Sequence, residues 1–102
     1  MIAISATDKK LTAPMDLRFG RAPYFYLTDG KESRFIVNPY CQEEHDVAPR
    51  VVKLLSEEKV DRIITGEVGP KAHTKLQQNN IQIIMLEEER IKISQVVKKI
   101  QF

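Results

Sequence analysis

The chain has 102 residues, of which 42% are hydrophobic and 29% are charged, and its formal net charge is +2. This length predicts a single soluble globular domain over residues 1–102, because two separate cores would each be too small to be stable. The 16 basic and 14 acidic residues are interleaved, which argues against a nucleic-acid-binding protein, whose cations gather in one stripe.

The order of apolar runs, turns and helical patterns predicts an α/β fold. An opening antiparallel hairpin followed by alternating helices and strands implies a mixed five-stranded sheet with helices on both faces. In chain order, the predicted elements are strands over 2–5, 24–28 and 34–37, a helix over 47–58, a strand over 60–65, a helix that begins at Pro70 and ends at Asn79-Asn80, a strand over 81–85 and a helix over 93–100.

Particular residues mark the ends of these elements. Gly30 lies in the hairpin turn between the second and third strands, where it can take a positive φ. Asp46 is a candidate N-cap residue for the first helix. The strand over 81–85 is apolar enough to be buried on both faces, and its last residue, Met85, is predicted to lie in the core. The three glutamates at 87–89 are predicted to form a solvated connector.

No apolar run approaches the roughly 20 residues that span a bilayer. The N-terminal apolar segment is too short, and the chain too polar beyond Ala6, for a signal peptide. Cys41 is the single cysteine, so no intrachain disulfide can form. We therefore expect a cytoplasmic protein that contacts no membrane and whose lone thiol stays reduced.

Two loops contain the residues with the most specific chemistry. Residues 18–25 read Arg-Phe-Gly-Arg-Ala-Pro-Tyr-Phe, and residues 66–70 read Gly-Glu-Val-Gly-Pro. Loops of this kind present backbone N–H groups and fixed positive charge to an anion. The guanidinium groups of Arg18 and Arg21 can bind carboxylates and phosphates through two hydrogen bonds each. Neither loop contains a catalytic constellation, so the sequence favours a carrier or binding protein over an enzyme.

Each of these residues also has a structural explanation. Arg21 could form an ion pair that fixes the long 7–23 loop to the sheet, and Arg18 could lie on the surface. Phe19 could belong to the core. The two glycines of the second loop, Gly66 and Gly69, could simply frame a tight turn.

Taken in order, these features resemble a known protein family. They are a short N-terminal strand, the run Phe19-Gly20-Arg21-Ala22-Pro23-Tyr24-Phe25, Asn38-Pro39 after the hairpin, an acidic loop with His45, Val60-Asp61 before the fourth strand, and Gly66-x-x-Gly69-Pro70-x-Ala72. The pattern is similar to the dinitrogenase iron–molybdenum cofactor biosynthesis family, which includes NifX-like proteins, the C-terminal domain of NifB and a nitrogenase accessory factor. The chain departs from it in two places. Leu17 and Arg18 replace the usual Ser and His, and the acidic run replaces a glycine-containing turn.

The resemblance implies a three-layer, ribonuclease H-like fold whose five-stranded mixed sheet has the order 3-2-1-4-5. In that order the fourth strand adjoins the first, so the turn after the fourth strand and the 7–23 loop could share a pocket. The resemblance also implies a non-enzymatic carrier of an iron–sulfur or iron–molybdenum-type cluster, or its precursor, between donor and acceptor proteins. The cofactor-binding residues would be Arg18, Phe19, Gly20, Arg21, Gly66 and Gly69.

Cys41 and His45 are the candidate metal ligands. A thiolate and an imidazole in a loop before a helix N-terminus can converge on one metal, and the helix dipole favours the thiolate. Two ligands are too few for a closed zinc site, but they suffice for a preassembled cluster that brings its own sulfide scaffold. Alternatively, Cys41 is a small, partly buried hydrophobic residue and His45 is an ordinary surface residue.

Other functions remain open on the sequence alone. A two-metal nuclease of the same fold would need converging carboxylates, usually including one on the first strand, and residues 2–6 contain none. The main alternative to a cluster carrier is a small-anion-binding or protein-interaction module without metal. The chain would act as a monomer or as a homodimer, and a dimer would double the number of ligands.

Overall fold

The computed structural model describes residues 1–102 and contains five strands and three helices. In chain order these are β1 (Ile2–Ala6), β2 (Tyr24–Thr28), β3 (Ser33–Val37), α1 (Val47–Glu57), β4 (Arg62–Thr65), α2 (Pro70–Gln78), β5 (Gln82–Met85) and α3 (Ile93–Lys99). Every predicted element is present, and the boundaries differ from the expected ones by no more than about two residues.

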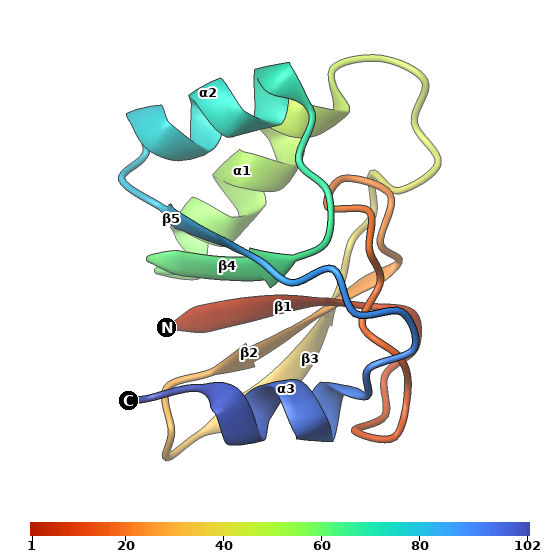
Figure 1. Ribbon diagram of the computed structural model, residues 1–102. Coiled ribbons are helices and arrows are strands. Elements are labelled where there is room, and N and C mark those ends of the chain that lie inside the picture. Colours follow the sequence, from red (N-terminus) through yellow and green to blue (C-terminus); the bar gives the residue numbers. More distant parts are fainter.

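The five strands form one mixed sheet in the order β3-β2-β1-β4-β5 (Figure 1). β2 runs antiparallel to its neighbours β1 and β3, whereas β4 runs parallel to its neighbours β1 and β5. Helices α1 and α2 cover one face of the sheet and α3 covers the other. The mixed α/β sheet predicted from the sequence is therefore confirmed, as are the three layers and the strand order that the family resemblance implies.

A hydrophobic core lies on each face of the sheet, because alternate residues of a strand point to opposite faces. In the central strand β1, Ile2 and Ile4 pack with Ile93 on the side of α3. Ala3, between them, packs with Leu55 on the side of α1 and α2. All five residues of β1 are buried as a result.

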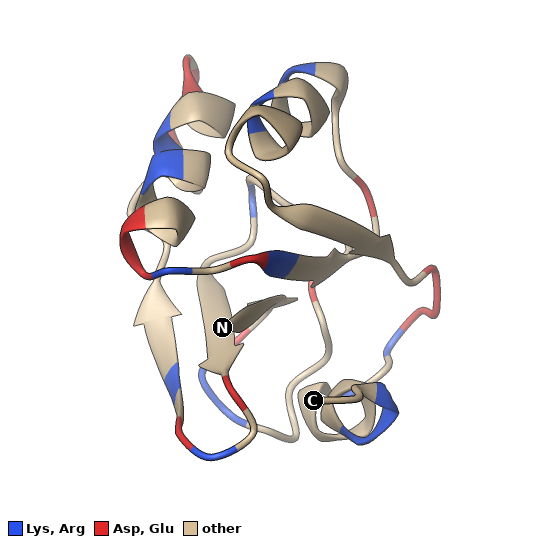
Figure 2. Cartoon of the chain, turned by 90° about the vertical axis from the view of Figure 1, so that its left-hand side faces the viewer, with Lys and Arg blue, Asp and Glu red and all other residues tan.

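Strand β5 lies at the edge of the sheet, and this corrects the prediction that it is buried on both faces. Met85 is 59% exposed, so it is not a core residue, and Gln82 is exposed as well. Only Ile83 and Ile84 are partly buried, one against each core. An edge strand has a neighbour on one side only, which the apolar run by itself could not reveal. Residues 87–89 continue from this edge as an exposed loop, as expected for a solvated connector (Figure 2).

The helix termini follow the predictions, with one difference at Asp46. Pro70 begins α2 after Gly69, and Asn80 takes a left-handed conformation after its end, with φ of 57°. Asp46 occupies the N-cap position of α1, but its side chain makes no capping hydrogen bond. None of the three helices is both long and apolar enough to cross a membrane.

The turn between β2 and β3 is closed by Asp29. Its Oδ1 accepts hydrogen bonds from the backbone N–H groups of Glu32, at 2.7 Å, and Lys31, at 2.8 Å. These two bonds hold the pKa of Asp29 below its ordinary value. Gly30 follows with φ of 92°, as predicted for this turn.

We expect Asp29→Asn to weaken the pH dependence of folding. Because the folded state lowers the pKa of Asp29, the stabilisation is present above the ordinary value of about 3.9 and is lost as the pH falls through the folded pKa. Urea unfolding at a series of pH values should therefore show a smaller acid-induced loss of stability for the variant. An acid response equal to that of the unaltered chain would show that Asp29 contributes nothing to it.

Candidate functional site

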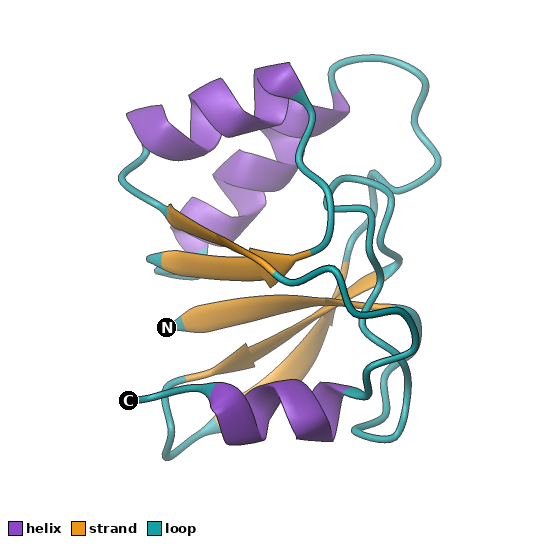
Figure 3. Cartoon of the chain, viewed as in Figure 1, coloured by secondary structure: helices purple, strands orange, loops and turns teal.

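The loops that the sequence singles out collect at one end of the sheet (Figure 3). Residues 7–23 follow β1, and the turn at 66–69 follows β4. Because β1 and β4 are parallel neighbours, the two loops leave the sheet side by side. The loop over residues 38–46, which connects β3 to α1, lies at the same end.

The first two loops are in direct contact. The N–H group of Phe19 donates to the carbonyl oxygen of Glu67 at 3.2 Å, and the N–H group of Glu67 donates to that of Leu17 at 2.5 Å. A Cβ atom on Gly66 would lie 2.7–2.8 Å from three atoms of Leu17, including its Cα. Gly66 is therefore required for the close approach of the two loops, and its own φ is not positive.

A cavity of about 600 Å³ opens between these loops and the first turns of α1 and α2. The pocket expected between the two loops is thus present. Five of the six predicted cofactor-binding residues line it, namely Arg18, Phe19, Gly20, Arg21 and Gly69. Phe19 is only 2% exposed and also belongs to the core. Gly66 lines a smaller hollow of about 310 Å³ beside the cavity.

Charged side chains make the cavity wall electropositive. Arg18, Arg21 and Lys71 contribute three cations, and Glu67 is the one carboxylate among the lining residues. Lys71 was not predicted. Lys71 is the second residue of α2, directly after Pro70. Its place in the first turn of a helix that follows the Gly66–Gly69 turn is the signal that could have placed it at the cavity.

Backbone N–H groups of two helices add to this positive character. Val47 and Ala48 in the first turn of α1, and Lys71 and Ala72 in that of α2, line the cavity. Their N–H groups have no hydrogen-bond acceptor within the protein. Neither first turn contains an acidic residue, and neither helix has a side-chain cap. Unpaired N–H groups and helix dipoles of this kind favour an anion.

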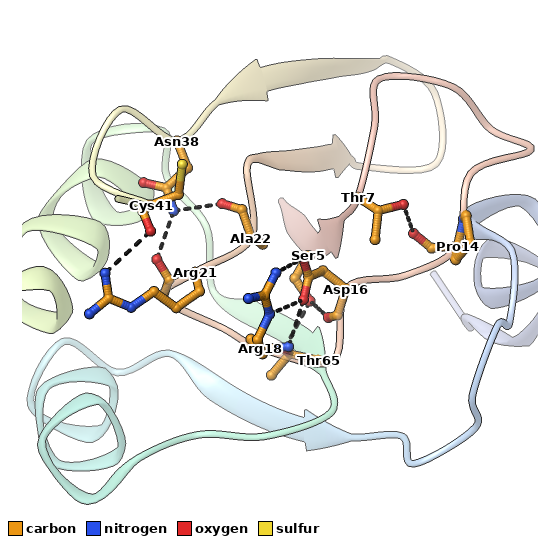
Figure 4. Close-up of polar contacts among 11 residues, drawn as sticks. Ser5, Thr7, Pro14, Asp16, Arg18, Arg21, Ala22, Asn38, Cys41 and Thr65 are labelled. Carbon is orange, nitrogen blue, oxygen red and sulfur yellow. Dashed lines mark hydrogen bonds and ion pairs between the residues drawn. The ribbon is translucent and has the colours of Figure 1, made fainter. Parts of the chain in front are cut away.

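Arg18 lies at the surface, as expected, with its side chain 63% exposed, but it is paired with Asp16 (Figure 4). Its Nε lies 3.2 Å from Asp16 Oδ1, and its Nη2 lies 3.2 Å from Asp16 Oδ2. The hydrogen bonds and the charge of Asp16 raise the pKa of Arg18 above its ordinary value. The sequence did not single out Asp16. An aspartate often accepts a hydrogen bond from the backbone N–H group two residues later. Here the N–H group of Arg18 donates to Asp16 Oδ1 at 2.9 Å.

Asp16 is itself held at the ends of β1 and β4. Its residue is only 4% exposed, and its backbone N–H donates to the carbonyl oxygen of Ser5 at 2.8 Å. The Oγ of Ser5 lies 2.5 Å from the carbonyl oxygen of Asp16 and 2.8 Å from the Oγ1 of Thr65. Ser5 and Thr65 are fully buried, so these contacts fix the start of the loop firmly to the sheet.

Arg21 connects the cavity wall to the 38–46 loop. It does so through hydrogen bonds to backbone oxygens, not through an ion pair that fixes the 7–23 loop to the sheet. Its Nη1 donates to the carbonyl oxygens of Glu43 and, at 3.3 Å, of Cys41. The bonds therefore go to main-chain oxygens, which hold the loop without cancelling the charge of Arg21.

Cys41 and His45 do not line the cavity. His45 is exposed, and Cys41 is a half-buried free thiol. No group of three or more His, Cys, Asp or Glu side chains is arranged to hold a metal ion. The fold thus gathers the predicted arginines and glycines in one place, while the two candidate metal ligands remain in the adjoining loop.

Comparisons with known proteins identify the family and the fold. A family model described as dinitrogenase iron-molybdenum cofactor matches residues 1–101. The apo form of the orange protein from Desulfovibrio gigas superposes with a TM-score of 0.89 and 28% identity, over 96% of this chain and 83% of the other. A putative NifB protein from Thermotoga shares the fold, with a TM-score of 0.80 and 24% identity over 95% of this chain and 83% of the other. No protein with a curated description matches the chain.

Proposed function

This chain belongs to the dinitrogenase iron–molybdenum cofactor family, and we propose that it is a non-enzymatic carrier of an anionic metal–sulfur cluster. The cargo would be an iron–sulfur or iron–molybdenum-type cluster or its precursor, received from a donor protein and passed to an acceptor protein. The observation that carries the proposal is the 600 Å³ cavity, in which cations and unpaired N–H groups converge.

The chemistry of the cavity suits an anion that must later be released. Metal–sulfur clusters hold negative charge on their sulfide and thiolate sulfurs, which accept hydrogen bonds. Lys71, Arg21 and the N–H groups of the two helices can surround such a cluster without bonding to its metal atoms. Contacts of this kind are reversible, because each exchanges with water at small cost.

We propose Cys41 and His45 as additional ligands that hold one or two irons of the cargo. Arg21 supports this assignment, because its two hydrogen bonds attach their loop to the cavity wall. His45 is exposed and Cys41 is half-buried, so both are accessible to an incoming cluster. Two ligands suit a carrier, since the cluster brings its own sulfide scaffold.

A small-anion-binding module is the second candidate. It is favoured by one observation, namely that the polar groups lining the cavity are three cations and several N–H donors, with a single carboxylate, Glu67, and no Cys or His. This function would use the same cavity without a cluster, and it predicts that Cys41 and His45 are dispensable.

The test is anaerobic reconstitution with iron and sulfide, followed by absorption spectra and iron counting. We expect stoichiometric retention by the unaltered chain and about fivefold weaker retention by Lys71→Ala, because an exposed charge contact contributes up to about 1 kcal/mol. Lys75→Ala is the matched control, since Lys75 is exposed on the same helix outside the cavity.

The outcomes separate the proposals. Loss of iron in Cys41→Ala or His45→Ala would establish these residues as ligands, and full retention in both would exclude them. If no version retains iron, the cluster carrier is wrong. Inorganic phosphate that then binds the unaltered chain, and binds Lys71→Ala more weakly, would establish the small-anion module.

A further inference from the structure

The Arg18–Asp16 pair has an arrangement that stability alone does not explain. Asp16 is 4% exposed, yet the side chain of its partner Arg18 is 63% exposed. Removing a carboxylate from water is costly, and the attraction to an exposed partner is weakened by solvent. An ion pair that buries one charge is therefore weak evidence for stabilisation, and fixing a geometry is the other role that such a pair can have.

The pair stands on the boundary between two hollows. Arg18 lines both the 600 Å³ cavity and a neighbouring hollow of about 520 Å³, whereas Asp16 lines only the second. Asp16 therefore holds the guanidinium from the side that faces away from the cavity. It uses Nε and Nη2, which leaves the donors of Nη1 free.

We infer that Asp16 is a positioning residue for anion binding, which aims the free edge of the Arg18 guanidinium into the cavity. This inference rests on the proposed function and adds to it a determinant of affinity. A free arginine side chain loses much rotamer freedom when it binds an anion. Arg18 has lost that freedom before the anion arrives, because its planar group is held at two points.

A positioning role for Asp16 predicts a direction of change in anion affinity that differs from the direction expected for other roles. The Asp16 carboxylate repels an anion, so its removal by Asp16→Asn would raise affinity if charge alone mattered. If Asp16 positions Arg18, the same change lowers affinity when Arg18 is present and raises it when Arg18 has been removed. A merely structural role would lower affinity in both backgrounds.

The experiment is a double-mutant cycle with Asp16→Asn and Arg18→Ala, read out by anaerobic titration of a synthetic dianionic four-iron–four-sulfur thiolate cluster. We expect Asp16→Asn to weaken binding about fivefold in the unaltered background and to strengthen it modestly in Arg18→Ala, since groups in contact couple strongly. The nitrogen relaxation of the Arg18 Nε–H group should show an ordered side chain that Asp16→Asn makes mobile.

Arg18→Lys provides a second variant that keeps the charge and leaves Asp16 in place. It should also weaken binding, because an ammonium group cannot make the two-point contact. The same sign of the Asp16→Asn effect in both backgrounds would overturn the inference and leave the carrier proposal intact. Failure of the unaltered chain to bind the cluster would overturn both.

Discussion

Replacing Gly66 by alanine is expected to lower the melting temperature by about 15 °C. A Cβ atom at this position would lie under 3 Å from the Cα of Leu17, so the backbone of one loop must move. Overpacking of this kind costs up to about 3 kcal/mol, and each kcal/mol shifts the melting temperature of a chain of this size by roughly 4–8 °C. Thermal unfolding followed by circular dichroism measures the change.

Under the proposed function, the same substitution should also weaken anion binding, because it separates the two loops that form the cavity. The hydrogen bonds of Phe19 with Glu67 and of Glu67 with Leu17 hold these loops together. For the melting temperature, Gly69→Ala is the matched control, since a Cβ atom there meets nothing within 4 Å. Its cost should stay below about 1 kcal/mol, the usual penalty for alanine at an N-cap. Equal melting temperatures for Gly66→Ala and Gly69→Ala would show that Leu17 can move away from the new Cβ atom at little cost in stability.

Asn38→Ala is expected to destabilise the chain by about 3 kcal/mol, because it leaves buried polar groups unpaired. Asn38 is 1% exposed, and its Nδ2 donates to the carbonyl oxygens of Ala22, at 2.8 Å, and Gly20, at 3.1 Å. Its Oδ1 accepts the N–H group of Tyr40 at 3.1 Å. The side chain of Asn38 therefore joins the loop over residues 7–23 to the loop over residues 38–46. Figure 4 shows its hydrogen bond to Ala22. Urea unfolding gives the free energy directly.

Asn38→Asp separates the loss of these bonds from the loss of volume. The new carboxyl group keeps the acceptor for Tyr40, but when ionised it faces two carbonyl oxygens. The folded state then raises its pKa, so its penalty is small in acid and grows as the pH rises above the ordinary value of about 3.9. We expect the difference in stability from the unaltered chain to narrow as the pH falls from neutral toward about 4, and to stay constant below that value. A difference that does not depend on pH would contradict this account of Asn38.

The sequence predicted the elements well because their signals are local. The hairpin turn at Gly30, the start of α2 at Pro70 and the end of α2 at Asn80 are each decided by residues within a few positions. Strand β5 shows the limit of such signals. Its apolar run resembles a buried strand, yet Met85 is exposed, because burial depends on whether another strand lies beyond β5.

The candidate site was only partly predictable, for a related reason. Arg18 and Arg21 stand out in the sequence, but their partners do not. Arg21 binds main-chain oxygens about 20 residues away, which no side-chain pattern records. Lys71 and the N–H groups of α1 reach the cavity from other elements, so their role appears only when the helices are placed.

By itself, the sequence determined the order and type of the elements and the two loops that can attract an anion. Turn residues, caps and apolar periodicity act over short distances and do not depend on the rest of the chain. The tertiary structure alone decided that these loops share one cavity, that two helix N-termini open into it, and that Cys41 and His45 lie outside its lining. The shared cavity follows from the parallel pairing of β1 with β4, which brings together segments about 60 residues apart.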